Sequence, residues 1–134
     1  MIFTVPGTPH PWQRARISRS GRMFTDAKTK AYKEKIALYA RQAGVELLEG
    51  PVRITMICYW PSRKPDLKKN PRDIEWMDKR PDIDNILKVY LDALQGIAFT
   101  DDRQIVNVDA RKFRARQGDD ARVQISIHQI LTGS

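Results

Sequence analysis

The alternation of apolar and polar residues along the chain predicts four strands. They cover residues 2–5, 52–60, 104–114 and 121–130. In 52–60, one face is entirely apolar and the other becomes apolar towards its end, which is typical of a central strand. The segment Gln117-Gly118-Asp119-Asp120 separates the last two strands and predicts a hairpin-like turn between them.

A helical repeat of apolar residues predicts two helices. The first is capped by Thr25 or Asp26, extends to about residue 43 and ends at Gly44. Its expected apolar stripe consists of Tyr32, Ile36, Tyr39 and Ala43. The second helix covers about 84–95 and ends at Gly96. The order is β-α-β-α-β-β without an internal repeat, which predicts an α+β fold: one small domain over residues 1–134, with a mixed sheet packed by two helices.

Two segments show neither the alternation typical of a strand nor the apolar repeat typical of a helix. Residues 14–22 form a basic loop, in which Ser and Gly separate Arg14, Arg16, Arg19 and Arg22. These arginines are candidate DNA-binding residues because a guanidinium can hold a phosphate bidentately, although a solvated loop is the alternative. Residues 61–81 form a long polar loop with four prolines. Trp76 and Met77 in this loop could dock it onto the body of the protein or onto a partner.

Charge and composition restrict the classes of function that the chain can have. The chain has 134 residues, a net charge of +8 and a pI of about 9.9, which favours a polyanionic partner such as nucleic acid over a merely basic protein. The single cysteine, Cys58, lies in an alternating run and is expected in the core. The chain has only two histidines, which is too few for a histidine-rich metal site, so any metal must be held by carboxylates. No run suggests a signal peptide or a membrane span, so we expect a cytoplasmic protein.

The second helix has an unusual distribution of polar residues. Wound at ~100° per residue, Asp84, Asn85, Lys88, Asp92 and Gln95 fall within an arc of about 100°. The other residues are apolar, the reverse of an ordinary surface helix, so the polar stripe is expected to line a cleft. Alternatively, Asp82 and Asp84 are helix caps and Lys88 an ion-pair partner. Capping uses one side chain and accounts for only one of the two aspartates.

A third aspartate completes a candidate metal site. Asp102 follows Asp101 just before a predicted strand, and it would approach Asp82 and Asp84 if that strand lies beside the helix start. Three carboxylates without histidine or cysteine suit a hard cation such as Mg²⁺. Such an ion activates water for attack on a phosphate, and a lysine neutralises the developing charge. This combination within a basic chain predicts a nuclease.

The same residues resemble the RusA family of Holliday junction resolvases, small endodeoxyribonucleases often carried by prophages. The resemblance rests on Asp82-Ile83-Asp84-Asn85-Ile86-Leu87-Lys88, Leu91-Asp92-Ala93-Leu94 and Thr100-Asp101-Asp102-Arg103-Gln104-Ile105-Val106. Two features differ from the family pattern: the 61–81 loop is longer, and Thr100 stands where an apolar residue is expected.

The resemblance implies roles for individual residues. Asp82, Asp84 and Asp102 would be the catalytic and Mg²⁺-binding carboxylates, and Lys88 the catalytic lysine. The protein would act as a homodimer whose paired sites cut two opposed strands of a four-way junction during DNA recombination and repair. Asp92 inherits no catalytic role, and we expect it to shape the site or its helix.

Two other functions remain open at this point. A non-catalytic nucleic-acid-binding module would explain the charge and the arginine-rich loop, but it would gain nothing from carboxylates within a basic groove. A metal-dependent nuclease for flaps or forks would keep the same chemistry with another target.

Overall fold

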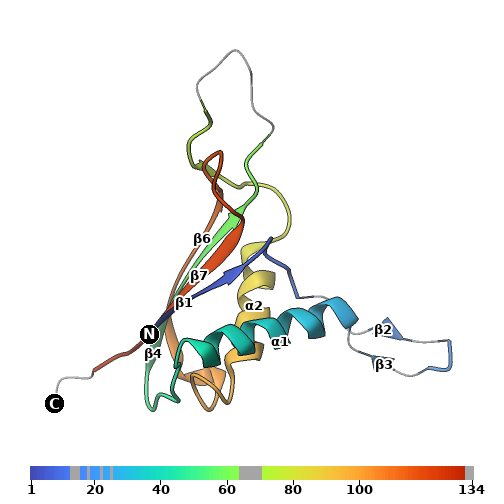
Figure 1. The fold of residues 1–134 in the computed structure, drawn as a ribbon. Helices are drawn as coiled ribbons and strands as arrows, with labels where there is room; N and C mark the ends of the chain where they lie inside the picture. Colours follow the sequence, from blue (N-terminus) through green and yellow to red (C-terminus); the bar gives the residue numbers. More distant parts are fainter. Residues whose placement is uncertain (13–15, 18, 22, 25, 64–70, 132–134) are drawn as a thin grey trace.

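The central feature of the fold is a five-stranded mixed sheet (Figure 1). The computed structural model describes the chain except for residues 13–15, 18, 22, 25, 64–70 and 132–134. The strands are β1 (Ile2–Pro6), β4 (Val52–Trp60), β5 (Glu75–Trp76), β6 (Ile105–Arg114) and β7 (Arg122–Gln129). Their order is β1-β7-β4-β6-β5, with β4 and β6 parallel and the other pairs antiparallel. The α+β class and the predicted order of the longer elements are confirmed.

Two helices lie on one side of this sheet, as Figure 1 shows. They are α1 (Ala27–Gln42) and α2 (Ile83–Leu94). Asp26 caps α1, because its carboxylate accepts hydrogen bonds from the backbone N–H groups of Lys28 and Thr29 at 2.8 and 3.1 Å. The predicted end at Gly44 is confirmed, since this glycine has a φ of 76° directly after the C-cap.

The apolar stripe predicted for α1 needs correction. Tyr32 and Ile36 are buried as expected, but the stripe continues through Ala40, while Tyr39 is only half-buried and Ala43 is exposed. Ala43 is the C-cap of the helix, so its side chain lies beyond the part that packs on the sheet. Residues at positions 32, 36 and 40 follow the four-residue spacing of one helix face.

The core lies between the helices and β4, with β1 and β7 beside it. Val52, Ile54, Met56 and Cys58 alternate inward along β4 and are completely buried. The expectation that Cys58 is a core residue is confirmed, and burial raises the pKa of its thiol to about 12. These residues make β4 the centre of the sheet, as its sequence predicted.

The predicted hairpin between the last two strands is wrong. β6 and β7 lie on opposite sides of β4 and do not pair with each other. The turn at 117–120 therefore crosses the end of β4. An alternating sequence fixes which face of a strand is buried, but it does not fix the neighbouring strand, because any pairing of suitable register satisfies the same pattern.

The two aperiodic segments contain short strands that no periodicity could indicate. Within 14–22 and the residues after it, β2 (Arg16–Ile17) pairs with β3 (Met23–Phe24) in a small hairpin that projects from the body (Figure 1). In the 61–81 loop, β5 pairs with the end of β6 and Met77 is buried. Residues 75–77 of this loop are thus docked onto the body, in agreement with one of the two predicted alternatives.

In the part of the chain that the structure describes, neither helix has the length and apolar character needed to cross a membrane.

The two helices share a buried polar contact. The hydroxyls of Tyr32 on α1 and Tyr90 on α2 lie 2.7 Å apart, and the two rings meet edge to face. Burial raises the pKa of Tyr32 to about 12 and that of Tyr90 well above its usual value. Both phenols therefore stay neutral at physiological pH and their hydrogen bond persists.

We predict that Tyr90→Phe lowers the free energy of unfolding by about 1–2 kcal/mol, because it leaves the buried hydroxyl of Tyr32 without this partner. Urea unfolding followed by circular dichroism measures the change. Tyr39→Phe, on the half-buried part of α1, is the matched control and should change stability by less than about 0.5 kcal/mol. Equal losses in the two variants would contradict this account of the contact.

Candidate active site

The packing of α2 determines which of its residues reach solvent. Ile86, Val89, Tyr90 and Leu94 are completely buried against the core. Asp84, Lys88 and Asp92 lie on the opposite side and are exposed. The narrow polar stripe expected from the sequence is therefore the solvent-facing side of a helix that is otherwise inserted into the protein.

Asp82 and Asp84 lie together at the start of α2. Asp82 occupies the N-cap position, but its side chain makes no capping hydrogen bond. Asp84 accepts a hydrogen bond from the backbone N–H of Asn85 at 3.0 Å. Among the described residues, neither carboxylate takes part in an ion pair. Capping thus fails to explain Asp82, and its oxygens remain available to a ligand.

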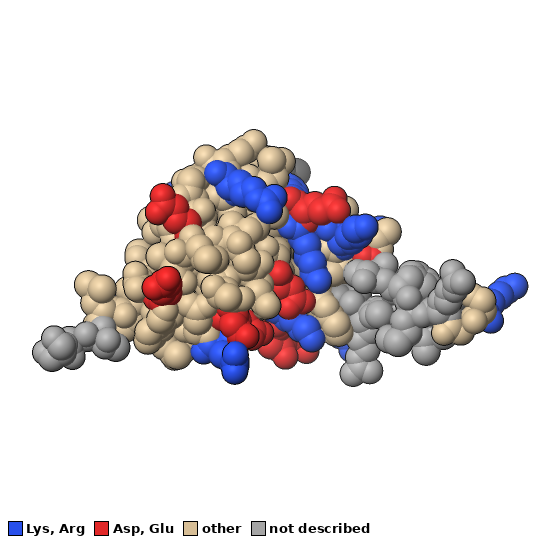
Figure 2. All heavy atoms as spheres, turned by 90° about the horizontal axis from the view of Figure 1, so that it is seen from below, with Lys and Arg blue, Asp and Glu red and all other residues tan. Residues whose placement is uncertain are grey.

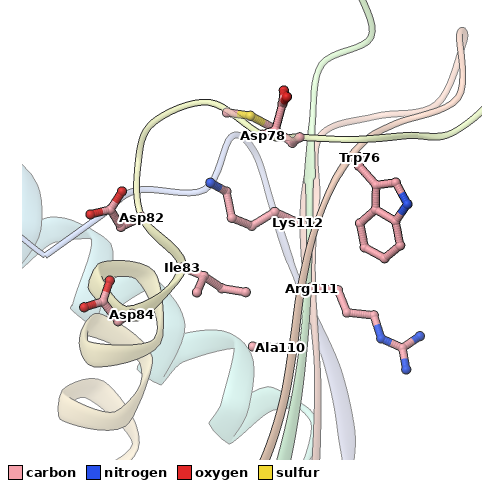
Figure 3. Close-up of a pocket in the computed structure, with 9 residues that line it drawn as sticks. Trp76, Asp78, Asp82, Ile83, Asp84, Ala110, Arg111 and Lys112 are labelled. Atoms are coloured by element: carbon pink, nitrogen blue, oxygen red, sulfur yellow. The ribbon is translucent and has the colours of Figure 1, made fainter.

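A pocket of about 520 Å³ separates the start of α2 from β6. Its walls are formed by the two aspartates and Ile83 on one side, by Ala110, Arg111 and Lys112 of β6 on another, and by Trp76, Met77 and Asp78 after β5. In Figure 3, Lys112 extends to the side of β6 where Asp82 and Asp84 lie, whereas Arg111 and Trp76 extend to the other side. The pocket therefore combines acidic and basic groups at the edge of the sheet.

Lys112 also holds the chain segment that closes this pocket. Its ammonium donates to the carbonyl of Lys79 at 2.6 Å, and its own carbonyl accepts from the N–H of Met77 at 3.0 Å. These two bonds fix the segment that leads from β5 into α2, and hence the position at which Asp82 begins the helix.

Lys88 lies one turn after Asp84 and is held by a residue that the sequence analysis did not single out. Its ammonium is 3.8 Å from the centroid of the Trp12 ring. Trp12 is itself anchored, because its backbone N–H donates to the backbone carbonyl of Asn85 at 2.9 Å. The only sequence signal for Trp12 was an aromatic residue after a proline-rich turn, and that signal indicates no partner. The cation–π contact directs the lysine along the polar side of α2.

Asp92 has a structural partner. Its carboxylate lies 3.4 Å from the ammonium of Lys33 on α1, so the pair links the two helices two turns beyond Asp84. This arrangement agrees with the expectation that Asp92 supports its helix.

Asp102 lies at the other end of β6. It begins the short 3₁₀-helix η1 (Asp102–Gln104), which immediately precedes β6. Gln104 anchors η1 by donating to the carbonyls of Leu48 and Gly50, both at 3.0 Å, beside the start of β4. The start of α2 lies instead beside residues 110–112, because α2 and β6 run in opposite directions (Figure 1).

One chain therefore brings together Asp82, Asp84 and Lys88, but not Asp102. Residues 105 and 111 alone are about 20 Å apart along a strand. Within the described residues, no three histidine, cysteine, aspartate or glutamate side chains come close enough to share a metal ion. The sequence-based condition for a three-carboxylate site, that β6 begins beside the start of α2, is not met within a single chain.

Asp101, the neighbour of Asp102, is engaged locally. Its carboxylate caps η1 by accepting from the N–H of Arg103 at 2.8 Å, and the Arg103 guanidinium lies 3.1 Å away. These hydrogen bonds hold the pKa of Asp101 below its usual value. Asp101 therefore has a sufficient structural role, whereas the exposed Asp102 does not cap the helix it begins.

Two of the candidate DNA-binding arginines, Arg16 and Arg19, belong to the small projecting hairpin. Arg16 begins β2 and Arg19 is exposed in the turn that follows, whereas Arg14 and Arg22 lie outside the described residues. Figure 2 shows acidic and basic side chains interspersed on the lower end of the molecule.

Comparison with known proteins relates this arrangement to a family. Residues 6–128 match the model of the family described as "Endodeoxyribonuclease RusA". The chain is also 32% identical over 139 residues to "Uncharacterized protein YqaN" of Bacillus subtilis (strain 168). That match covers 96% of this chain and 95% of the relative, so the likeness extends over both proteins almost completely.

We predict that Trp12→Leu releases Lys88. The ε-methylene protons of Lys88 should lose the upfield NMR shift that an indole ring imposes, and the free energy of unfolding should fall by about 1 kcal/mol. Trp12→Phe is the control, since it keeps a ring under the ammonium and should retain part of the shift. A Lys88 resonance that is the same in Trp12→Leu as in the unsubstituted protein would contradict the contact.

Proposed function

The chain belongs to the RusA endodeoxyribonuclease family, and we propose that it is a Mg²⁺-dependent nuclease that resolves four-way DNA junctions. Its setting would be DNA recombination and repair in the cytoplasm. The observation that carries the proposal is the carboxylate pair at the start of α2, where Asp82 makes no capping hydrogen bond. Lys88 lies one turn after Asp84 on the same side of the helix, and all three residues are within the segment that the family model matches.

The donor groups at the start of α2 fit a hard divalent cation. Asp82 makes no capping bond, the pair has no ion-pair partner among the described residues, and the available ligands are oxygens alone. We propose Asp82 and Asp84 as metal ligands and Asp102 as a third. A bound Mg²⁺ would polarise the scissile phosphate and lower the pKa of a water molecule.

The protein's own groups would act on the phosphate by charge and position. Lys88, exposed and oriented by Trp12, can contact a non-bridging phosphate oxygen and stabilise the negative charge that develops during hydrolysis. Lys112 on the far wall of the pocket would add positive charge that attracts the DNA backbone to the side of β6 where the carboxylates lie. The arginines of the projecting hairpin, including the exposed Arg19, would contact further phosphates.

Resolution of a junction requires two cuts in opposed strands. We therefore propose a homodimer with two equivalent sites related by a two-fold axis, which matches the approximate two-fold symmetry of a four-way junction.

We predict that Asp84→Asn lowers the rate of Mg²⁺-dependent cleavage of a four-way junction by at least about 100-fold, because it removes a charged metal ligand. Binding of the junction, measured by gel shift, should stay within about twofold, since the phosphate contacts come from basic residues. Asp92→Asn is the matched control: its carboxylate is on the same helix but pairs with Lys33, and cleavage should stay close to that of the unsubstituted protein.

The substrates of this assay separate the remaining possibilities. Faster cutting of flaps or forks than of four-way junctions would replace the proposed target while keeping the chemistry. Salt-sensitive binding without cleavage of any branched substrate would indicate a binding module and refute the proposal of a nuclease.

A further inference from the structure

The sheet has a second face, on the side away from the two helices (Figure 1). Along β4 the completely buried residues alternate with side chains on this second face, of which Tyr59 is the last. The strand register places Arg122 of β7 on one side of Tyr59 and Phe113 of β6 on the other. Trp76 of β5 is in turn the partner of Phe113. Because partnered residues of neighbouring strands point to the same face, these side chains form one row across the sheet.

The members of this aromatic row, Tyr59, Phe113 and Trp76, contact one another. The Tyr59 and Phe113 rings have centroids 5.8 Å apart and planes inclined by 28°. The Phe113 and Trp76 rings are 4.5 Å apart and inclined by 32°. At the other end, the Arg122 guanidinium lies 4.0 Å from the centroid of the Tyr59 ring. The row is therefore a continuous series of flat groups in offset stacking, closed by a cation at one end.

The other end of the row is open. Trp76 is 68% exposed, although an indole ring is among the largest apolar groups of a protein. It belongs to the two-residue strand β5 at the edge of the sheet, and its ring contact among the described residues is with Phe113. One more flat group could stack on the indole and extend the row. A rigid aromatic side chain held in this way loses little conformational freedom when it binds a ligand.

The open end of the row adjoins the candidate active site. Trp76 lines the same pocket as Asp82 and Asp84. In Figure 3 its indole extends to the side of β6 away from Lys112 and the two aspartates. A ligand that stacks on Trp76 would therefore lie across the edge of the sheet from the carboxylate pair, within reach of the same DNA strand.

The charge between Trp76 and the aspartate pair favours a polyanion. Lys79 and Arg80 are exposed in this segment, against one acidic residue, Asp78. Among the described residues, neither of the two cations takes part in an ion pair. A flat aromatic group attached to a polyanionic backbone is the chemistry of single-stranded nucleic acid, whose bases stack on aromatic side chains while basic residues follow the phosphates.

We propose that an unpaired base of the DNA substrate stacks on the open face of Trp76, while its backbone passes Lys79 and Arg80 towards Asp82 and Asp84. This inference deepens the proposed function: it rests on that function for the reaction, and it names the part of the substrate that the protein recognises. The choice of DNA follows from the endodeoxyribonuclease family to which the chain belongs.

Stacking on Trp76 selects among DNA structures without reading their sequence. Every base has an aromatic face, so the contact tolerates any base. A base within a duplex must first be unpaired and unstacked, whereas a base that is already unpaired reaches the indole without that cost. Trp76 thus favours substrates with unpaired bases beside the scissile phosphate. It lies in the 61–81 loop, in which this chain is longer than the family pattern.

Binding of single strands in EDTA tests the stacking without cleavage. We expect a labelled oligothymidylate to bind at least about tenfold more tightly than an abasic oligomer of equal length, by fluorescence anisotropy. Trp76→Ala should remove this difference and leave the affinity for the abasic oligomer within about twofold. Leu38→Ala is the matched control, since it removes an exposed apolar side chain of α1 and should keep the difference. Equal affinities of the two oligomers for the unsubstituted protein would overturn the proposal.

Tryptophan emission provides a second test that does not depend on removing the ring. Oligothymidylate should quench the emission of the unsubstituted protein more than the abasic oligomer does, because a base then covers the indole of Trp76. Trp76→Phe keeps an aromatic ring in β5 and should bind oligothymidylate within about threefold of the unsubstituted protein. In this variant the base-dependent quenching should disappear, although Trp12 and Trp60 still emit. Base-dependent quenching that persists in Trp76→Phe would contradict the assignment to Trp76.

The outcomes distinguish this inference from the proposed function. Cleavage of junctions by a protein that does not discriminate the two oligomers would overturn the stacking and leave the nuclease proposal standing. Base-dependent binding through Trp76 by a protein that cuts no DNA would refute the proposed function and leave the stacking in place. Tighter binding of oligouridylate than of oligothymidylate would overturn the choice of DNA. Trp76 emission that changes with protein concentration alone would assign the indole to a second copy of the chain instead.

Discussion

The burial of one side of α2 is the constraint on which the rest of the site depends. Ile86, Val89, Tyr90 and Leu94 are excluded from water, and no other rotation of the helix would bury all four. That rotation turns Asp84 and Lys88 to solvent. The hydrophobic effect on one side of the helix thus determines the direction of the charged groups on the other, before any ligand is present.

The neighbouring contacts refine this placement. Trp12 comes from the segment after β1 and Lys112 from β6, yet both act on the start of α2: one holds Lys88 and the other holds the segment before Asp82. An aspartate pair without a cation is subject to mutual repulsion. The printed contacts of Lys88 and Lys112 are with Trp12 and the Lys79 carbonyl, and neither aspartate forms an ion pair among the described residues.

The relative direction of α2 and β6 has a further consequence for assembly. A single copy separates Asp102 from the aspartate pair by most of the length of a strand. An enzyme that cuts only as a dimer would benefit from such a separation, because an isolated subunit would lack a complete site and could not nick DNA on one strand.

The sequence by itself determined the longer strands and helices, the α+β class, the buried side of α2 and the proximity of Asp82, Asp84 and Lys88, because these depend on local periodicity and spacing along one helix. It could not indicate that β7 pairs with β4 and not with β6, that Trp12 contacts Lys88, or that Asp102 lies far from Asp82 in one chain. These relations join segments distant in the sequence. Only the packing of the whole chain decides them, since several pairings and helix directions satisfy the same pattern of apolar residues.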